Sequence, residues 1–270
     1  MLLCQRDGQV TSFLITIQHR IFMKFILFKA AGLLACTIAI CSCNKTKSDE
    51  STLRGHYINQ SFLEAAKDSV PGTINTYCYE LDFVSDDSVK VFYGFEEATL
   101  AYAKSGKKYA INAAFQDKDL LFSISEDHKL MLEDSVWKQS DTHSVFQKAD
   151  STSSGQWNFP AKLNEVMIAR SYEIFEKGKA TGQKVTFSPD GKVTGLGDFT
   201  SYEVCFSGDC VGEVHPVSNN ITLSSGSINS VYAFQYNPAE SVLNIYNIEA
   251  PIPDIKGERA IKTVAYELHY

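Results

Sequence analysis

Polar and apolar residues alternate along much of this chain. Residues 77–83 are the clearest case, with apolar side chains at the odd positions and polar ones or a cysteine at the even positions, which predicts a strand with one apolar face. Similar short segments span residues 89–95, 98–104, 108–115, 119–124, 129–133, 184–188, 192–196, 200–206, 209–215, 220–224, 230–236, 241–247 and 260–269. Clusters of Gly, Asn, Asp and Ser separate them, so we expect antiparallel meanders that curl or close and thereby remove exposed edges.

Two of the predicted turns lie in similar sequences. Residues 83–89 (Phe-Val-Ser-Asp-Asp-Ser-Val) match residues 187–193 (Phe-Ser-Pro-Asp-Gly-Lys-Val) at an offset of 104 positions. The same offset gives three further pairs, which are Phe95 with Phe199, Leu100 with Val204, and Tyr102 with Phe206. We therefore expect the chain to contain two tandem repeats of one β-rich unit, at residues 53–150 and 151–270. The Ser-rich residues 151–155, at the start of the second unit, would connect them.

Each unit also contains a stretch that predicts a short helix after its first strand. In the first, Ser61 and Glu64 have the spacing of a capping box, and Pro71-Gly72 ends the helical pattern. In the second, Asn158 is placed to cap a helix that Pro160 enters. Apolar residues near helical spacing follow, namely Leu163, Val166, Met167 and Ile174.

The openings of the two units carry a family resemblance. Gly155-Gln156-Trp157 is a Gly-x-Trp sequence before a predicted meander, and Gly55-His56-Tyr57 differs from it by one aromatic exchange. This pattern resembles lipocalins and lipocalin-like lipoproteins, although the units are shorter and the helix follows the first strand instead of ending the unit. The resemblance implies a mostly β fold of two barrels or half-barrels, with an apolar cavity as one possible interior.

The amino-terminal segment has the features of a secretory signal. Lys24 and Lys29 precede an uncharged apolar run of 11 residues, 30–40, which is too short to span a bilayer as a helix. Residues 40–43 (Ile-Cys-Ser-Cys) resemble the lipobox of bacterial lipoproteins. The resemblance implies cleavage after Ser42 and a lipid attached to Cys43. Residues 1–22, with Arg6, Asp7 and His19-Arg20, do not form the start of a signal peptide, so we expect translation to start at Met23 and residues 1–42 to be an upstream segment and signal peptide.

Charge and composition narrow the class of partner. Residues 1–42 hold four basic residues and one acidic residue, which leaves 21 basic and 31 acidic residues and a formal charge of −10 in the mature chain. Such a surface disfavours nucleic acid and anionic lipid headgroups, so the acyl chains at Cys43 must provide the attachment to the membrane. Residues 43–52 are polar and lack aromatic side chains, which indicates a flexible linker.

Four cysteines remain in the mature chain, at positions 43, 78, 205 and 210. Cys205 and Cys210 flank a predicted hairpin turn at Ser207-Gly208, where they would face each other as a non-hydrogen-bonded pair. We predict a disulfide between them, which the oxidising envelope permits, and regard a metal pair as the less favoured alternative. Cys78 remains, and a free cysteine is most often buried.

Motifs that carry chemistry are missing from the sequence. The five mature histidines have no metal-ligand spacing, and the two Ser-x-x-Lys sequences lack the partner motifs of the enzymes that use them. No Gly-x-Ser-x-Gly elbow, phosphate-binding glycine loop or calcium loop is present. We therefore expect no catalytic residues, no cofactor and no metal, and predict that the protein is not an enzyme.

Two functions remain open from the sequence. In the first, a lipid-anchored protein of the bacterial cell envelope, most simply of the outer membrane, binds a small apolar ligand or a partner protein. In the second, it is a structural or assembly subunit of an envelope complex whose β cores are solid. Aromatic or apolar side chains align on one strand face at residues 232, 234 and 236, and on another at residues 266, 268 and 270. These side chains would either fill a core or line a cavity.

Overall fold

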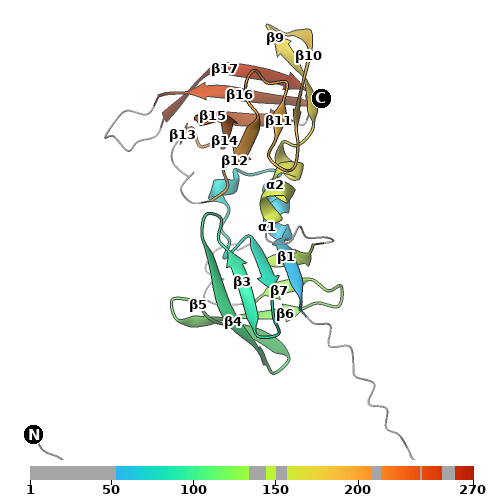
Figure 1. Cartoon of the computed structure of the whole chain (residues 1–270), viewed down its shortest axis with the longest axis vertical. Coiled ribbons are helices and arrows are strands. Elements are labelled where there is room, and N and C mark those ends of the chain that lie inside the picture. Colours follow the sequence, from blue (N-terminus) through green and yellow to red (C-terminus); the bar gives the residue numbers. More distant parts are fainter. Residues whose placement is uncertain (1–52, 134–143, 150–156, 208–213, 238, 251–258) are drawn as a thin grey trace, which may run out of the picture. The chain divides into compact units, whose positions relative to one another are not determined.

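The computed structural model describes residues 53–133, 144–149, 157–207, 214–237, 239–250 and 259–270. It confirms a mostly β fold with two antiparallel barrel-like sheets in tandem, the first coloured blue to green and the second yellow to red in Figure 1. The predicted linker 151–155 and the leading residues 1–52 lie outside the described residues. The domain boundaries expected from the sequence therefore stay a prediction.

The first barrel is a closed up-and-down meander. Each strand pairs with the next one in the chain, and the last pairs with the first through Tyr57 and Lys148. The strands are β1 (Gly55–Asn59), β2 (Glu80–Phe83), β3 (Ser88–Phe92), β4 (Glu97–Ser105), β5 (Lys108–Phe115), β6 (Lys118–Ile124), β7 (Leu130–Leu132) and β8 (Val145–Lys148). Closure leaves this meander without an exposed edge, as the sequence predicted.

The second sheet is a similar meander that is nearly closed. Its order is β11-β10-β9-β17-β16-β15-β14-β12, with β13 pairing in parallel with β17. An isolated bridge between Lys192 and Ser201 joins its two ends, so we call it the second barrel. The strands are β9 (Ser171–Glu176), β10 (Lys179–Phe187), β11 (Val193–Thr194), β12 (Ser201–Val204), β13 (Val214–His215), β14 (Asn219–Ser225), β15 (Ile228–Asn237), β16 (Val242–Ile248) and β17 (Arg259–His269).

The matched turns occupy equivalent places in the two barrels. Phe83 pairs with Val89 between β2 and β3, and Phe187 pairs with Val193 between β10 and β11. Beyond the turn the equivalence changes, because the next hairpin is shorter in the second barrel: Ser88 pairs with Ala101 in the first, whereas Lys192 bridges Ser201 in the second. The offset therefore falls from 104 to 100, so the pairs Leu100 with Val204 and Tyr102 with Phe206 were wrong, and that of Phe95 with Phe199, inside the hairpin loop, is untested.

The first helix, α1 (Gln60–Ala65), follows β1 as predicted, but its cap differs from the prediction. Asn59 is the N-cap, and its Oδ1 accepts the N–H of Phe62 at 3.0 Å. Ser61 instead accepts the backbone N–H of Val145 on β8 at 3.0 Å, and Glu64 bonds to the side chain of Gln60. The expected capping box was therefore wrong. A 3₁₀ turn, η1 (Pro71–Thr73), lies in the connection to β2.

The second helix, α2 (Phe159–Met167), precedes the first described strand of its barrel instead of following one. Ile174, which we expected on this helix, lies in β9, because the helix ends at Met167 and the chain then pairs with both β10 and β17. Trp157 lies two residues before the start of α2 and outside any strand. Tyr172, not Trp157, is the equivalent of Tyr57, since Tyr172 pairs with Val185 as Tyr57 pairs with Leu81.

The cores of the barrels are filled by side chains. In the first barrel the inward residues, such as Leu81, Phe122 and Phe146, are fully buried and form one cluster. A second cluster fills the other barrel, with Phe234 and Leu268 fully buried, and it continues into α1, α2 and two strands of the first barrel. The two barrels therefore share part of their core, and α1 contacts α2 there (Figure 1).

Candidate functional site

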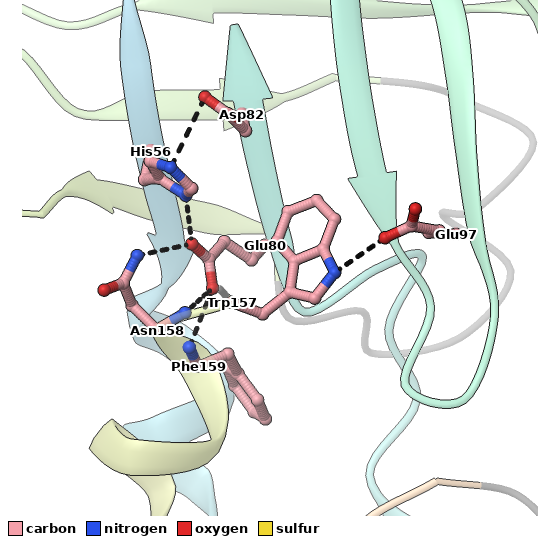
Figure 2. A network of polar contacts seen from close by, with 7 residues as sticks. All are labelled: His56, Glu80, Asp82, Glu97, Trp157, Asn158 and Phe159. Carbon is pink, nitrogen blue, oxygen red and sulfur yellow. Dashed lines mark hydrogen bonds and ion pairs between the residues drawn. The ribbon is translucent and has the colours of Figure 1, made fainter. Parts of the chain in front are cut away.

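A buried carboxylate joins the two barrels at the start of α2. Glu80, the first residue of β2, is fully buried, and its Oε2 accepts the backbone N–H groups of Asn158 and Phe159 at 2.6 and 2.7 Å (Figure 2). Its Oε1 accepts Nδ2 of Asn158 at 2.9 Å. The first N–H groups of a helix have no partner within the helix and carry partial positive charge. Glu80 therefore caps α2 from the neighbouring barrel.

His56 lies between two carboxylates beside this cap. Its Nδ1 is 2.6 Å from Oε1 of Glu80, and its Nε2 is 3.6 Å from Oδ1 of Asp82, as Figure 2 shows. A buried carboxylate is costly unless it is paired and hydrogen-bonded, and His56 completes the pairing of Glu80. A nucleophile activated by this histidine would have to face Nε2, where Asp82 lies instead. The arrangement therefore fits a structural connection better than an acid–base pair.

Trp157 attaches the segment before α2 to the first barrel. Its Nε1 donates to Oε2 of Glu97 at 2.9 Å, and its ring stacks on Phe92 with the centroids 5.0 Å apart. The ring is also nearly perpendicular to that of His56, with the two centroids 6.2 Å apart. The aromatic residue that we expected in the first strand of the second unit thus belongs to the contact between the barrels.

Five aromatic rings pack where the barrels meet. Phe159 of α2 lies 4.9 Å from Tyr79 and 5.1 Å from Phe206, measured between ring centroids. Tyr79 also donates its hydroxyl to the carbonyl of Phe206 at 3.1 Å. Burial raises the pKa of Tyr79 to about 12, with a smaller contribution from Cys78. Phe62 and Phe92 complete the group, which makes the contact between the barrels apolar and rigid.

An open pocket of about 660 Å³ lies at the same junction, and we call it the junction pocket. Residues 66–70, between α1 and η1, form one wall, and Val166 and Met167 at the end of α2 form another. Asn219 of β14 and residues 234–236 of β15 form the rest. Its volume lies within the range of small-molecule sites in proteins. Elements of both barrels are needed to build it.

Asn219, one of the residues that line the junction pocket, carries a buried polar atom without a partner. Oδ1 of Asn219 is shielded from solvent and has no hydrogen-bond partner. Beside it, Tyr236 is held in place by Arg170, whose Nη1 donates to the tyrosine hydroxyl at 2.9 Å and whose guanidinium lies 5.2 Å from the ring centroid. The ring of Tyr270 stacks on Tyr236 at 5.7 Å. The wall of the pocket therefore includes a fixed aromatic side chain, Tyr236, whereas Oδ1 of Asn219 is enclosed by the protein.

A second pocket, of about 480 Å³, lies on the other side of α2. Phe92 and Trp157 line it together with Tyr202 and Phe206 from the second barrel, and Asp190 and Glu203 are also at its surface. The polar groups of Trp157 and Asn164 already have protein partners, Glu97 and the carbonyl of Pro189. The indole N–H of Trp157 and the side-chain N–H₂ of Asn164 are therefore not free to bind a ligand in this pocket.

The cysteines predicted to carry chemistry lie largely outside the described residues. Neither Cys43 nor Cys210 is among them, so the lipid attachment and the Cys205–Cys210 disulfide stay predictions. The hairpin expected between residues 200–206 and 209–215 also stays a prediction, because residues 208–213 lie outside the described residues. β12 pairs with β14, and the N–H of Cys205 donates to the carbonyl of Asn220 at 3.0 Å. The later segment, β13, pairs with β17.

Cys78 is fully buried, as expected for a free cysteine, and burial raises the pKa of its thiol well above the ordinary value. A protonated, enclosed thiol is a poor nucleophile. Within the described parts of the chain, no three His, Cys, Asp or Glu side chains come together in a way that could hold a metal ion.

Comparison with protein-family models, with curated proteins and with solved structures gives no match to this chain. Among the residues that the structure describes, no helix is both long and apolar enough to cross a membrane.

Sequence reasoning missed the residues that form the junction. Glu80 was expected on the polar face of its strand, but α2 covers that face and buries it. Asn219 and Arg170 carried no motif. The missing signal is long-range, because each of these residues acquires its role from an element far away in the sequence.

Proposed function

We propose that this chain is a lipid-anchored protein of the bacterial cell envelope that binds a ligand and catalyses no reaction. The short apolar run before the lipobox-like residues 40–43 supports the anchor at Cys43. We also propose that its body belongs to the lipocalin-like lipoproteins, which the up-and-down meander of the closed first barrel favours. An oxidising compartment would in turn favour the disulfide between Cys205 and Cys210.

The junction pocket carries the proposal of ligand binding. It has a volume of about 660 Å³, walls from both barrels and a lining that includes the apolar residues Val70, Val166 and Met167. The sequence had suggested the barrel interiors as the ligand site, but Leu81, Ile111 and Phe122 and the other inward residues of the first barrel fill it. A site between the barrels explains why one chain would hold two of them.

The test is native mass spectrometry of the mature protein purified from envelope membranes. We expect a bound small molecule, and we expect Val70→Trp, which fills the junction pocket, to abolish its binding. Val84→Trp is the matched control, because Val84 is partly exposed and lies outside that pocket. A co-purified molecule that both variants retain, or a wild-type protein that binds nothing from an envelope extract, would contradict the proposal.

A second candidate function is assembly with another envelope protein. Phe95 and Ile228 are 64% and 66% exposed, and large apolar side chains at a surface are candidates for partner contacts. Crosslinking in intact cells tests this function. A partner crosslinked near Phe95 and lost in Phe95→Ser, while Val70→Trp has no effect, would favour assembly over ligand binding.

The anchor is tested separately. Intact-mass analysis of the native protein is expected to give residues 43–270 carrying diacylglycerol and an acyl chain, and Cys43→Ala is expected to abolish lipid attachment and release the protein from the membrane fraction. A full-length, unmodified product among cytosolic proteins would rule the anchor out. The same spectra with and without reductant report the disulfide as a mass difference of two hydrogens.

A further inference from the structure

We propose that the second pocket, beside α2, is a docking site for a basic segment of a partner protein. An apolar side chain of that segment would fill the pocket, and its Lys or Arg side chains would lie at the rim. This inference goes beyond the ligand site proposed at the junction pocket and does not depend on it. It rests on an apolar lining, on donors that the protein already uses, and on carboxylates that both barrels place at the rim.

The part of the lining that solvent reaches is apolar. The pocket has a volume of about 480 Å³, and among its lining residues Pro189 is exposed and Trp157, Pro160 and Ala161 are partly exposed. The ring of Trp157 is held in place by stacking on Phe92. Fixed aromatic and apolar side chains at a surface are favoured at the centre of protein–protein contacts. An aliphatic or aromatic side chain of a partner would therefore bury apolar surface here.

The hydrogen-bond donors of the lining are engaged within the protein. Each of the four lining side chains that can donate already donates to a protein oxygen at 2.8 to 2.9 Å. These side chains are Trp157, Asn158, Asn164 and Tyr202, and their acceptors are Glu97, Glu80 and the carbonyls of Pro189 and Ser188. Among the described residues that line the pocket, none is Lys, Arg, His, Ser or Thr. A carboxylate or phosphate group of a ligand would therefore meet neither a cation nor an unused donor side chain.

The second barrel places a carboxylate at the rim of the pocket. Glu203 belongs to the lining and is exposed, and it has no ion-pair partner in the part of the chain that the structure describes. It lies between the buried residues Tyr202 and Val204 of β12, so it points outward and not into the pocket. Asp190 also belongs to the lining, but Lys192 already pairs with it. Glu203 is therefore the main charge on this side.

The first barrel places a second carboxylate beside the pocket. Glu97 is exposed and lies next to the indole of Trp157, whose Nε1 it accepts through Oε2 (Figure 2). Carboxylates bind ammonium and guanidinium groups through charge-assisted hydrogen bonds, for which the cation supplies the donors. The formal charge of −10 of the mature chain, from the 21 basic and 31 acidic residues after position 42, also attracts a basic partner.

The separation of apolar lining and charged rim favours a protein segment over a small free cation. A small cation inside the pocket would lie among apolar side chains and lose its hydration, which is costly without a paired charge. The outward direction of Glu203 keeps its carboxylate at the rim. A segment that crosses the pocket satisfies both parts, because its apolar side chain enters while its basic side chains reach the rim.

The experiment screens the mature protein, purified from membranes, on an array of short synthetic peptides that vary in charge and apolar content. The best-bound peptide is then titrated while tryptophan fluorescence is recorded, in a Trp137→Phe background that leaves Trp157 as the one tryptophan. We expect the bound peptides to combine Lys or Arg with an aliphatic or aromatic residue, and the emission of Trp157 to change on binding. Glu203→Lys is expected to weaken binding at least about tenfold.

Glu240→Lys is the matched control, because it changes the net charge by the same amount. Glu240 is exposed in the turn between β15 and β16 and lies outside the lining. We expect it to weaken binding by less than about twofold. Ala161→Trp fills the second pocket and is expected to abolish binding, whereas Val70→Trp, in the junction pocket, leaves it unchanged. Circular dichroism monitors folding, and if Ala161→Trp does not fold, the pair Glu203→Lys and Glu240→Lys decides.

The outcomes are distinct. Binding of basic peptides that Glu203→Lys loses and Glu240→Lys keeps supports the inference. A folded protein that binds no array peptide, or binds neutral or acidic ones best, overturns it. Equal losses in Glu203→Lys and Glu240→Lys also overturn it, since the charge of the whole chain would then attract the peptides. A dimer or a bound small molecule that native mass spectrometry detects and Ala161→Trp abolishes, with no peptide bound, would assign the pocket another occupant. The junction pocket is judged separately, by Val70→Trp.

Discussion

Tyr102 and Tyr202 each donate their hydroxyl to a backbone carbonyl in the matched turn of their own barrel. The hydroxyl of Tyr102 donates to the carbonyl of Ser85 at 3.1 Å, and that of Tyr202 donates to the carbonyl of Ser188 at 2.8 Å. Ser85 lies in the turn between β2 and β3, and Ser188 lies in the turn between β10 and β11. The side chain thus fixes that turn against the barrel.

The ring contacts repeat as well. In each barrel a phenylalanine at the end of a strand packs edge-to-face between two tyrosines, with centroid distances of 4.9 to 5.9 Å. The four pairs are Tyr57–Phe83, Phe83–Tyr102, Tyr172–Phe187 and Phe187–Tyr202. Two sets of residues with different offsets along the chain therefore form one recurring aromatic unit, and this is the strongest structural sign that the barrels are repeats.

The first prediction concerns these two hydroxyls. Tyr102→Phe and Tyr202→Phe each keep the ring and remove one hydrogen bond to a turn carbonyl, which costs about 1 kcal/mol of unfolding free energy. The two bonds share no partner, so the double variant is expected to lose about the sum, roughly 2 kcal/mol. Urea denaturation followed by tyrosine fluorescence measures this. A double variant no less stable than the single ones would show that the two hydrogen bonds do not stabilise the protein independently.

Local sequence pattern predicted most of the fold. Alternation in residues 77–83 and the turn at Pro189-Asp190-Gly191 are short-range signals, and both the strand and the turn are present, with Gly191 at φ +80°. β9 was missed because Ile174 also fits a helical spacing, and a single residue cannot decide between the periods. The pairing of β9 with β17, almost a hundred residues later, decides it.

The candidate site was beyond such reasoning. Glu80 and Asp82 alternate with apolar neighbours, so their pattern is that of any solvated strand face. The N-terminus of α2 covers Glu80 but leaves Asp82 partly exposed. Likewise, Asn219 gains its significance from residues 66–70 and from α2, which complete the junction pocket around it. Contacts between distant elements create both roles.

The second prediction concerns the cap of α2. Glu80→Gln preserves the volume of the side chain but replaces one carboxylate oxygen with an N–H₂ group. That group cannot accept the hydrogen bonds that Asn158 and Phe159 donate to Glu80, and the negative charge beside His56 is lost. We expect a loss of about 3 kcal/mol in unfolding free energy, measured by chemical denaturation at pH 7. Glu97→Gln is the control: its bond to Trp157 is exposed, and its loss should cost less than about 1 kcal/mol. Equal effects of the two changes would disprove the cap.

The third prediction concerns Gly94, between β3 and β4, where the first barrel closely approaches the second. Gly94 has φ +109°, and a Cβ there would lie 2.7 Å from Cβ of Ser207 and 3.2 Å from the ring of Tyr79. Gly94→Ala therefore combines backbone strain with a steric clash between the barrels, and we expect it to cost about 3 kcal/mol.

Gly106 provides the matched control for that variant. It also has positive φ, +65°, but nothing lies within 4 Å of the position that a Cβ would take. Gly106→Ala therefore incurs backbone strain alone, about 1 kcal/mol. Thermal denaturation distinguishes the two, and a melting temperature that falls no further in Gly94→Ala than in Gly106→Ala would mean that the close approach to Ser207 does not constrain the barrels.

The last prediction is a loss of stability at alkaline pH that depends on Tyr79. Burial raises the pKa of this tyrosine from 10.0 to about 12 in the folded protein. Above pH 10 the unfolded chain releases the phenolic proton while the folded protein keeps it, so the unfolded state binds fewer protons and the unfolding free energy falls as the pH rises. The fall spans about pH 10 to 12 and reaches up to about 3 kcal/mol for this group.

Tyr79→Phe removes the titration together with the bond to the carbonyl of Phe206. The variant should therefore be less stable than the wild type at pH 8, and the difference should shrink or reverse by pH 11. Urea denaturation at both values measures it, and a difference that stays constant between them would show that Tyr79 ionises as readily in the folded protein as in the unfolded chain.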